Sequence, residues 1–149
     1  MSLNYKQILV AVDGSKEAEW AFKKSVGIAI RNQATINLVN IIDTRSYSSI
    51  EAYDRSIAER AEKFALELLE GYKKEAEAAG VQNVNMVVEY GSPKVLIPKD
   101  LPKKHEIDLI ICGATGLNAM ERFLIGSVSE MIVRTAKCDV LVVRTEETL

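Results

Sequence analysis

The chain has 149 residues, of which 48% are apolar, and 21 acidic against 19 basic side chains leave a formal net charge of −2. This composition indicates one globular domain, residues 1–149, able to bury about two-thirds of the surface of its unfolded chain. It shows neither the basic stripe of a nucleic-acid-binding protein nor an apolar run approaching the roughly 18 residues of a membrane span. With no pattern of an export signal, a cytoplasmic location is expected, and Cys112 and Cys138 are interpreted as reduced thiols.

Strand-like and helix-like segments alternate along the first half of the chain. The apolar run 6–12 predicts a buried strand that ends at Asp13-Gly14-Ser15, and apolar residues then recur at helical spacing over 18–29. A second strand is expected at 34–42. After a polar stretch, a long helix is predicted to end at Gly80, with an apolar face made of Ile57, Ala61, Phe64, Leu68, Tyr72 and Ala76.

The second half continues the alternation. A third strand is expected at 84–90, and a turn follows with Ser92 at the N-cap and Pro93 at the first helical position. The next helix should be short or kinked, because Pro98 and Pro102 cannot donate inside it. The remaining elements are a fourth strand at 107–112, a glycine-containing segment at 113–126, a helix at 127–137 and a last strand at 140–144.

Strands that are apolar on both faces and separated by helices predict a doubly wound α/β domain, with a parallel sheet of about five strands covered on both sides. Ligands of such sheets bind beyond the carboxyl ends of the strands, where the strand order reverses. If the order is 3-2-1-4-5, the ends of the first and fourth strands are neighbours at that point. Periodicity alone does not give the order.

The segment "GATGLNAMERFLIGSVSE", residues 113–130, contains three of the eight glycines and has two interpretations. Gly113 and Gly116 let the main chain approach a ligand closely and permit a positive φ, and Gly126-Ser127 opens a helix whose free N–H groups favour an anion. Alternatively, the glycines only make turns, and Ser127 with Glu130 forms a capping box. The residues alone leave both interpretations open.

The spacing G-x2-G-x9-G-S resembles the nucleotide-binding segment of the universal stress protein family, in its ATP-binding subgroup. "ILVAVDGSKEAEWAF" is similar to that family's first strand and loop, "LVNIID" to its second strand, and "YGSPKVLI" to the turn after its third. The resemblance extends over essentially the whole chain. It implies a five-stranded sheet of order 3-2-1-4-5, a homodimer and binding of ATP.

The resemblance also implies roles for individual residues. Asp13 would accept hydrogen bonds from the ribose or adenine, and Ile41 would pack against adenine. Thr115 stands where many relatives have a basic residue, which weakens a cationic phosphate contact there. The other implied positions are the nucleoside-lining Ala11 and Val12, the ribose- and phosphate-facing Gly113 and Gly116, and the phosphate-holding Gly126, Ser127, Val128 and Ser129.

The expected function is that of a nucleotide-binding stress or regulatory protein, in which ATP (or AMP or ADP), with Mg²⁺ or Mn²⁺, acts as a signal. Groups for phosphoryl transfer are not evident at the glycine segment, so the enzymatic alternative, a slow ATPase or a nucleotide hydrolase or transferase on the same fold, is second. His105, among charged residues, is interpreted as solvated. A homodimer is expected through strand 140–144, whose outer edge invites a second chain.

Overall fold

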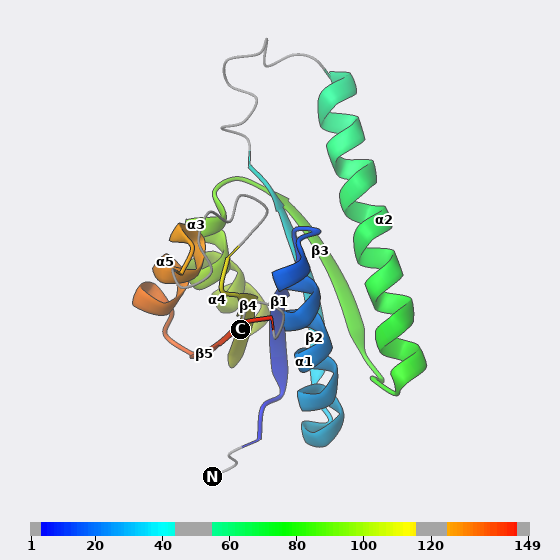
Figure 1. Cartoon of the computed structure of the whole chain (residues 1–149), viewed down its shortest axis with the longest axis vertical. Helices are drawn as coiled ribbons and strands as arrows, with labels where there is room; N and C mark the ends of the chain where they lie inside the picture. The colour runs from blue at the N-terminus through cyan, green and yellow to red at the C-terminus, as the bar shows by residue number, and fades with distance from the viewer. Residues whose placement is uncertain (1–3, 44–54, 116–124, 146–149) are drawn as a thin grey trace.

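The computed structural model describes residues 4–43, 55–115 and 125–145. Five parallel strands form one sheet in the order β3-β2-β1-β4-β5 (Figure 1), which confirms the predicted fold class and strand order. The strands are β1 Gln7–Ala11, β2 Thr35–Ile42, β3 Val84–Tyr90, β4 Leu109–Gly113 and β5 Asp139–Val143.

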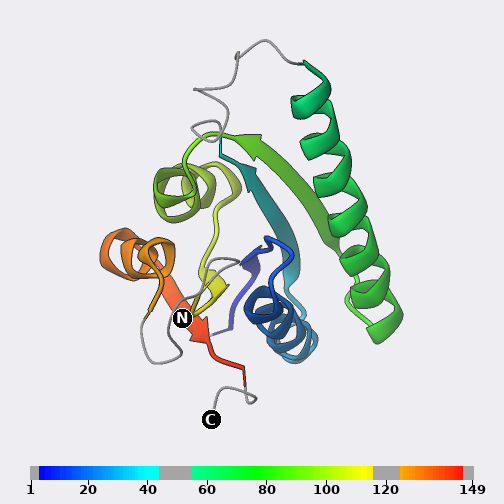
Figure 2. The same cartoon turned by 45° about the horizontal axis from the view of Figure 1, so that its top comes forward.

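Helices cover both faces of the sheet (Figure 2). On one face lie α1 (Lys16–Asn32) and α2 (Arg55–Ala79). On the other lie α5 (Ser127–Thr135) and a broken helix made of α3 (Pro93–Val95), the π-helical turn η2 (Leu96–Asp100) and α4 (Leu101–His105). The prediction of a short or kinked segment around Pro98 and Pro102 is therefore confirmed.

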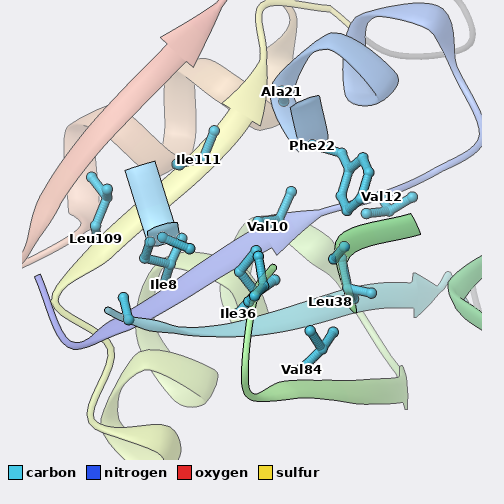
Figure 3. Packing of buried hydrophobic residues seen from close by; sticks show 14 of the residues in the cluster. Ile8, Val10, Val12, Ala21, Phe22, Ile36, Leu38, Val84, Leu109 and Ile111 are labelled. Carbon is cyan, nitrogen blue, oxygen red and sulfur yellow. The ribbon is translucent and has the colours of Figure 1, made fainter. Parts of the chain in front are cut away.

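The central strand β1 is buried from both sides because its side chains alternate between two cores. Ile8 and Val10 pack with Ile36, Leu38 and Phe22 under α1 and α2 (Figure 3). Leu9 packs into the second core, under α4 and α5, and all three of these β1 side chains are 0% exposed. Burial on both faces explains why the strands read as continuous apolar runs in the sequence.

The predicted apolar face of α2 is wrong at one position. Ala65, Leu69 and Ala76 are buried in the core, whereas Phe64 is 59% exposed. The ring of Phe64 lies beside the loop after β1, where a Cβ on Gly14 would be 3.7 Å from its Cζ atom. The upper part of α2 extends past the end of the sheet (Figure 1).

None of the helices in the described ranges is both long enough and apolar enough to cross a membrane.

Candidate functional site

The carboxyl ends of β1 and β4 lie side by side. The two strands pair in parallel with Val10 opposite Ile111, so the loop that begins at Asp13 and the loop that begins at Gly113 leave the same edge of the sheet. From β1 the chain continues to β2 on one side, while β4 and β5 lie on the other. This is the switch point at which doubly wound sheets bind ligands.

The loop after β1 is a tight turn held by Asp13. Its Oδ1 atom accepts the Ser15 N–H at 2.9 Å, and Gly14 has a φ of +88°, which favours glycine. Ser15 is buried and caps α1, its hydroxyl accepting the Ala18 N–H at 3.1 Å. The side chain of Asp13 is exposed, and its second carboxylate oxygen has no protein partner among the described residues. Asp13 therefore shapes the turn and still presents an acceptor at the edge.

Gly113 is required by a contact inside the protein. A Cβ at this position would lie 2.7 Å from the Cβ of Glu17 and 2.8 Å from its carbonyl carbon, so the absence of a side chain lets α1 pack against the end of β4. The positive φ that glycine permits is not used at Gly113; among the described glycines it occurs at Gly14, Gly80 and Gly91. Gly116 lies outside the described residues.

The capping-box interpretation of Ser127 is wrong. The N-cap of α5 is Gly126, with φ −64° and ψ 158°, and Glu130 donates its N–H to the Gly126 carbonyl at 2.9 Å. Ser127 is thus the first helical residue, one position too late to cap, and the Glu130 carboxylate pairs with Arg134 at 2.7 Å. The position of the N-cap is fixed by a tertiary contact, since the Gly126 N–H donates to the Ala114 carbonyl at 2.7 Å.

As a consequence, the N-cap residue of α5 is a glycine, which has no side chain to cap the helix. The first N–H groups of a helix lack partners within the helix and, together with the helix dipole, favour an anion. This end of α5 is joined through Ala114 to the end of β4, so it lies at the switch-point edge of the sheet.

The two serines of this helix end differ in their surroundings. The Ser127 side chain is exposed. Ser129 is buried, and its hydroxyl donates to the Gly113 carbonyl at 2.6 Å, which ties α5 to β4. Val128 packs into the second core, so only its main chain can face a ligand. Of the two serine hydroxyls expected to contact phosphate, that of Ser127 is the one without a partner in the described part of the chain.

The residues expected to line the nucleoside also lie at this edge of the sheet. Ala11 and Ile41 are half-buried and pack against the same core as Val128, on the α4 and α5 side of the sheet. Val12 is 2% exposed, and Thr115 is half-buried at the start of the second loop. All the predicted site residues within the described ranges therefore lie at one edge of the sheet.

Sequence reasoning missed Asn40, whose side-chain amide donates to the Val12 carbonyl at 2.7 Å. A polar residue in the middle of "LVNIID" was the available signal, because a buried strand has little reason to contain one. It also missed Glu17, which packs beneath Gly113 and accepts a hydrogen bond from the Thr145 hydroxyl at 3.2 Å.

Three other titratable side chains, those of Cys112, Cys138 and His105, are partly or fully buried. Burial raises the pKa of the Cys112 thiol to about 11, an effect that a hydrogen bond with Ser129 partly offsets, so this thiol stays protonated at neutral pH. Burial also raises the pKa of Cys138. The prediction that His105 is solvated is wrong in part, because its side chain is half-buried and its Nε2 atom is inaccessible, with no partner in the described part of the chain.

The model of the "Universal stress protein family" matches residues 4–144. The chain belongs to the universal stress protein family. It is 60% identical over 145 residues to a Staphylococcus haemolyticus protein named "Putative universal stress protein", covering 97% of this chain and 88% of the relative.

Solved structures of family members have the same fold. The universal stress protein UspA from Lactobacillus plantarum is 34% identical, with a TM-score of 0.85 over 96% of this chain and 100% of that one. A universal stress protein in complex with cAMP has a TM-score of 0.72 at 23% identity, covering 96% of this chain and 99% of that chain. An Arabidopsis thaliana family protein with AMP bound has a TM-score of 0.71 at 24% identity, covering 95% and 94%.

Proposed function

We propose that this universal stress protein binds an adenine nucleotide, ATP with Mg²⁺ or Mn²⁺, as a ligand-dependent regulatory switch in the cytoplasm. The observation that supports it most is the uncapped amino end of α5, joined by the 2.7 Å bond from Gly126 to the loop after β4 and thus beside the turn after β1. An anionic group at this position satisfies helix N–H groups to which the N-cap glycine offers no side chain. Two family members have been crystallised with cAMP and AMP.

In this proposal the nucleotide lies along the carboxyl edge. Its phosphates accept hydrogen bonds from the main-chain N–H groups of Val128 and Ser129 and from the hydroxyl of Ser127, and they lie against the Cα of Gly126. Its adenine packs near Ile41. The free carboxylate oxygen of Asp13 accepts hydrogen bonds from the ribose or base. Ala11, Val12, Gly113 and Thr115 line the remaining surface, and the role implied for Gly116 stays a prediction because this residue lies outside the described ranges.

We propose binding rather than turnover, because the nearby carboxylates in the described part of the chain have other roles. Glu130 pairs with Arg134, Glu17 packs under Gly113, and one oxygen of Asp13 holds its turn. Phosphoryl transfer needs carboxylates for the metal and a group that orients the nucleophile. In the described ranges no three His, Cys, Asp or Glu side chains group so as to hold a metal ion, so the proposed cation is held chiefly by the phosphates.

We expect ATP to bind more tightly with Mg²⁺ than in the presence of a chelator, whereas AMP and adenosine should lose little affinity. The reason is that triphosphate charge is offset mainly by the cation. Calorimetric titration of the three ligands with and without metal measures this. Equal losses for all three would place the phosphates away from α5, and no binding of any of them would overturn the proposed function.

We also propose a homodimer through strand 140–144. β5 lies at the end of the sheet and pairs with β4, so its other edge is open in the described part of the chain. Val140, Leu141 and Val142 are half-buried, while Met131 and Val133 on the adjoining α5 are 36% and 53% exposed. A second copy related by a two-fold axis can pair with this edge and cover both apolar groups at once.

Val142→Pro should convert the dimer to monomer while leaving the sheet folded. The Val143 carbonyl accepts the Ala114 N–H, so alternate residues 141 and 143 face β4 and Val142 directs its N–H to the open edge. Proline removes that donor, and edge strands tolerate it there. The matched control is Leu141→Pro, which breaks the ladder with β4 and should unfold the chain. Sedimentation velocity with circular dichroism measures both; a folded Val142→Pro dimer would place the interface elsewhere.

A further inference from the structure

The hydrogen-bond ladder between β1 and β2 ends in a side chain. The strand register closes with Ala11 opposite Val39, and the last main-chain bond donates the Val12 N–H to the Val39 carbonyl at 2.8 Å. In a regular parallel ladder the Ile41 N–H would donate next, to the Val12 carbonyl. The structure has the side-chain amide of Asn40 at that carbonyl instead, at 2.7 Å.

This bond fixes the main chain that leads into Asp13. The Val12 N–H and carbonyl are both held by β2, through Val39 and Asn40, and the Asp13 carboxylate is held by the Ser15 N–H at 2.9 Å. The Val12–Asp13 peptide is therefore fixed from the sheet on one side and from α1 on the other. Because the Asn40 side chain takes the place of a main-chain donor, the Ile41 N–H lies outside the regular ladder, at the edge where β1 and β2 end.

We propose that Asn40 is a positioning residue for the nucleoside half of the site: its amide replaces the last ladder bond and so sets the Val12–Asp13 and Ile41 main chains against which the nucleoside lies. This inference rests on the proposed nucleotide binding. Asparagine suits the position because it supplies an N–H donor to a carbonyl. Aspartate has nearly the same shape but would place a charged acceptor against that carbonyl, and leucine has no donor.

The test compares Asn40→Asp with Asn32→Asp. Asn32 makes an equivalent bond, its amide donating to the Ile28 carbonyl at 2.8 Å, but at the end of α1, away from the carboxyl edge. Affinities are measured for adenosine and, with Mg²⁺, for tripolyphosphate, on variants shown to be folded by circular dichroism. We expect Asn40→Asp to lower the affinity for adenosine at least tenfold and the affinity for tripolyphosphate less than twofold. Asn32→Asp should change neither affinity.

Each outcome has a distinct meaning. If the parent binds neither probe, the proposed function and this inference both fail. The role of Asn40 alone fails if the parent binds the probes and Asn40→Asp binds adenosine as tightly as the parent does. It also fails alone if Asn40→Asp loses affinity for adenosine and tripolyphosphate equally. If the aspartate variant does not fold, Asn40→Leu takes its place, and NMR of the parent gives an independent measurement. Adenosine should shift the side-chain amide resonances of Asn40 and tripolyphosphate should not; unmoved resonances would overturn the inference.

Discussion

Gly113→Ala is expected to lower the melting temperature by about 4–12 °C. The added methyl group would lie 2.7 Å from the Glu17 Cβ and 2.8 Å from the Glu17 carbonyl carbon, so the backbone of α1 or β4 must move. Overpacking of this kind costs about 1–3 kcal/mol, and we expect the upper half of that range because main-chain atoms cannot turn away. In a chain of this size each kcal/mol shifts the melting temperature by about 2–4 °C. Differential scanning calorimetry without nucleotide measures the change.

Gly71→Ala is the matched control for this substitution. Gly71 lies in the helix α2, where a Cβ would meet nothing within 4 Å, and alanine there should stabilise the protein by about 0.5–1 kcal/mol. Opposite signs for the two variants would show that the contact with α1, and not the loss of glycine, destabilises the protein. A Gly113→Ala protein as stable as the parent would contradict the packing of α1 against β4.

The contrast between these glycines shows what the sequence could and could not predict. Continuous apolar strands between helical periodicities were enough to predict a doubly wound parallel sheet, because each strand is buried on both faces. The order of the strands came from the resemblance to a family and not from periodicity. That Gly113 serves the packing of α1 depends on the approach of Glu17, which is 96 positions away in the chain. No local pattern contains that information.

The candidate site shows the same limit over a shorter distance. The sequence "GSVSE" correctly predicted a helix beginning near Ser127, but it could not show which residue is the N-cap. The bond from the Gly126 N–H to the Ala114 carbonyl decides this, and it spans the second loop. Because the N-cap is Gly126 and not Ser127, there is no capping box. The Ser127 side chain is exposed, and the Ser129 hydroxyl bonds to the Gly113 carbonyl. The structure thereby excludes the capping role of Ser127, one of the two interpretations that the sequence left open, and its phosphate-binding role stays a prediction.

Ser127→Ala should therefore lower mainly the affinity for ATP, whereas Ser129→Ala should lower mainly the folding stability. The Ser127 side chain makes no capping bond, so its loss should change stability by less than about 0.5 kcal/mol. A hydrogen bond to a charged phosphate is worth about 1.5–3 kcal/mol, so affinity for ATP should fall about 10- to 150-fold. Removing the Ser129 hydroxyl leaves the Gly113 carbonyl without its donor and should cost about 1–3 kcal/mol of folding stability, with a smaller change in affinity.

Gly126→Val should abolish ATP binding and completes this set of variants. The φ of −64° is open to any residue, and a Cβ would lie 3.4 Å from the Ala114 carbonyl oxygen and the Thr115 Cα, so we expect a stability cost of only about 1–2 kcal/mol. A branched side chain at the N-cap nevertheless covers the N–H groups that the phosphates require. Thermal melts and ATP titrations on all three variants separate folding from binding. If Ser127→Ala and Gly126→Val bind ATP like the parent, the amino end of α5 holds no phosphate. The glycines of this segment are then explained by packing and turns alone, as Gly113 already is by its contact with α1.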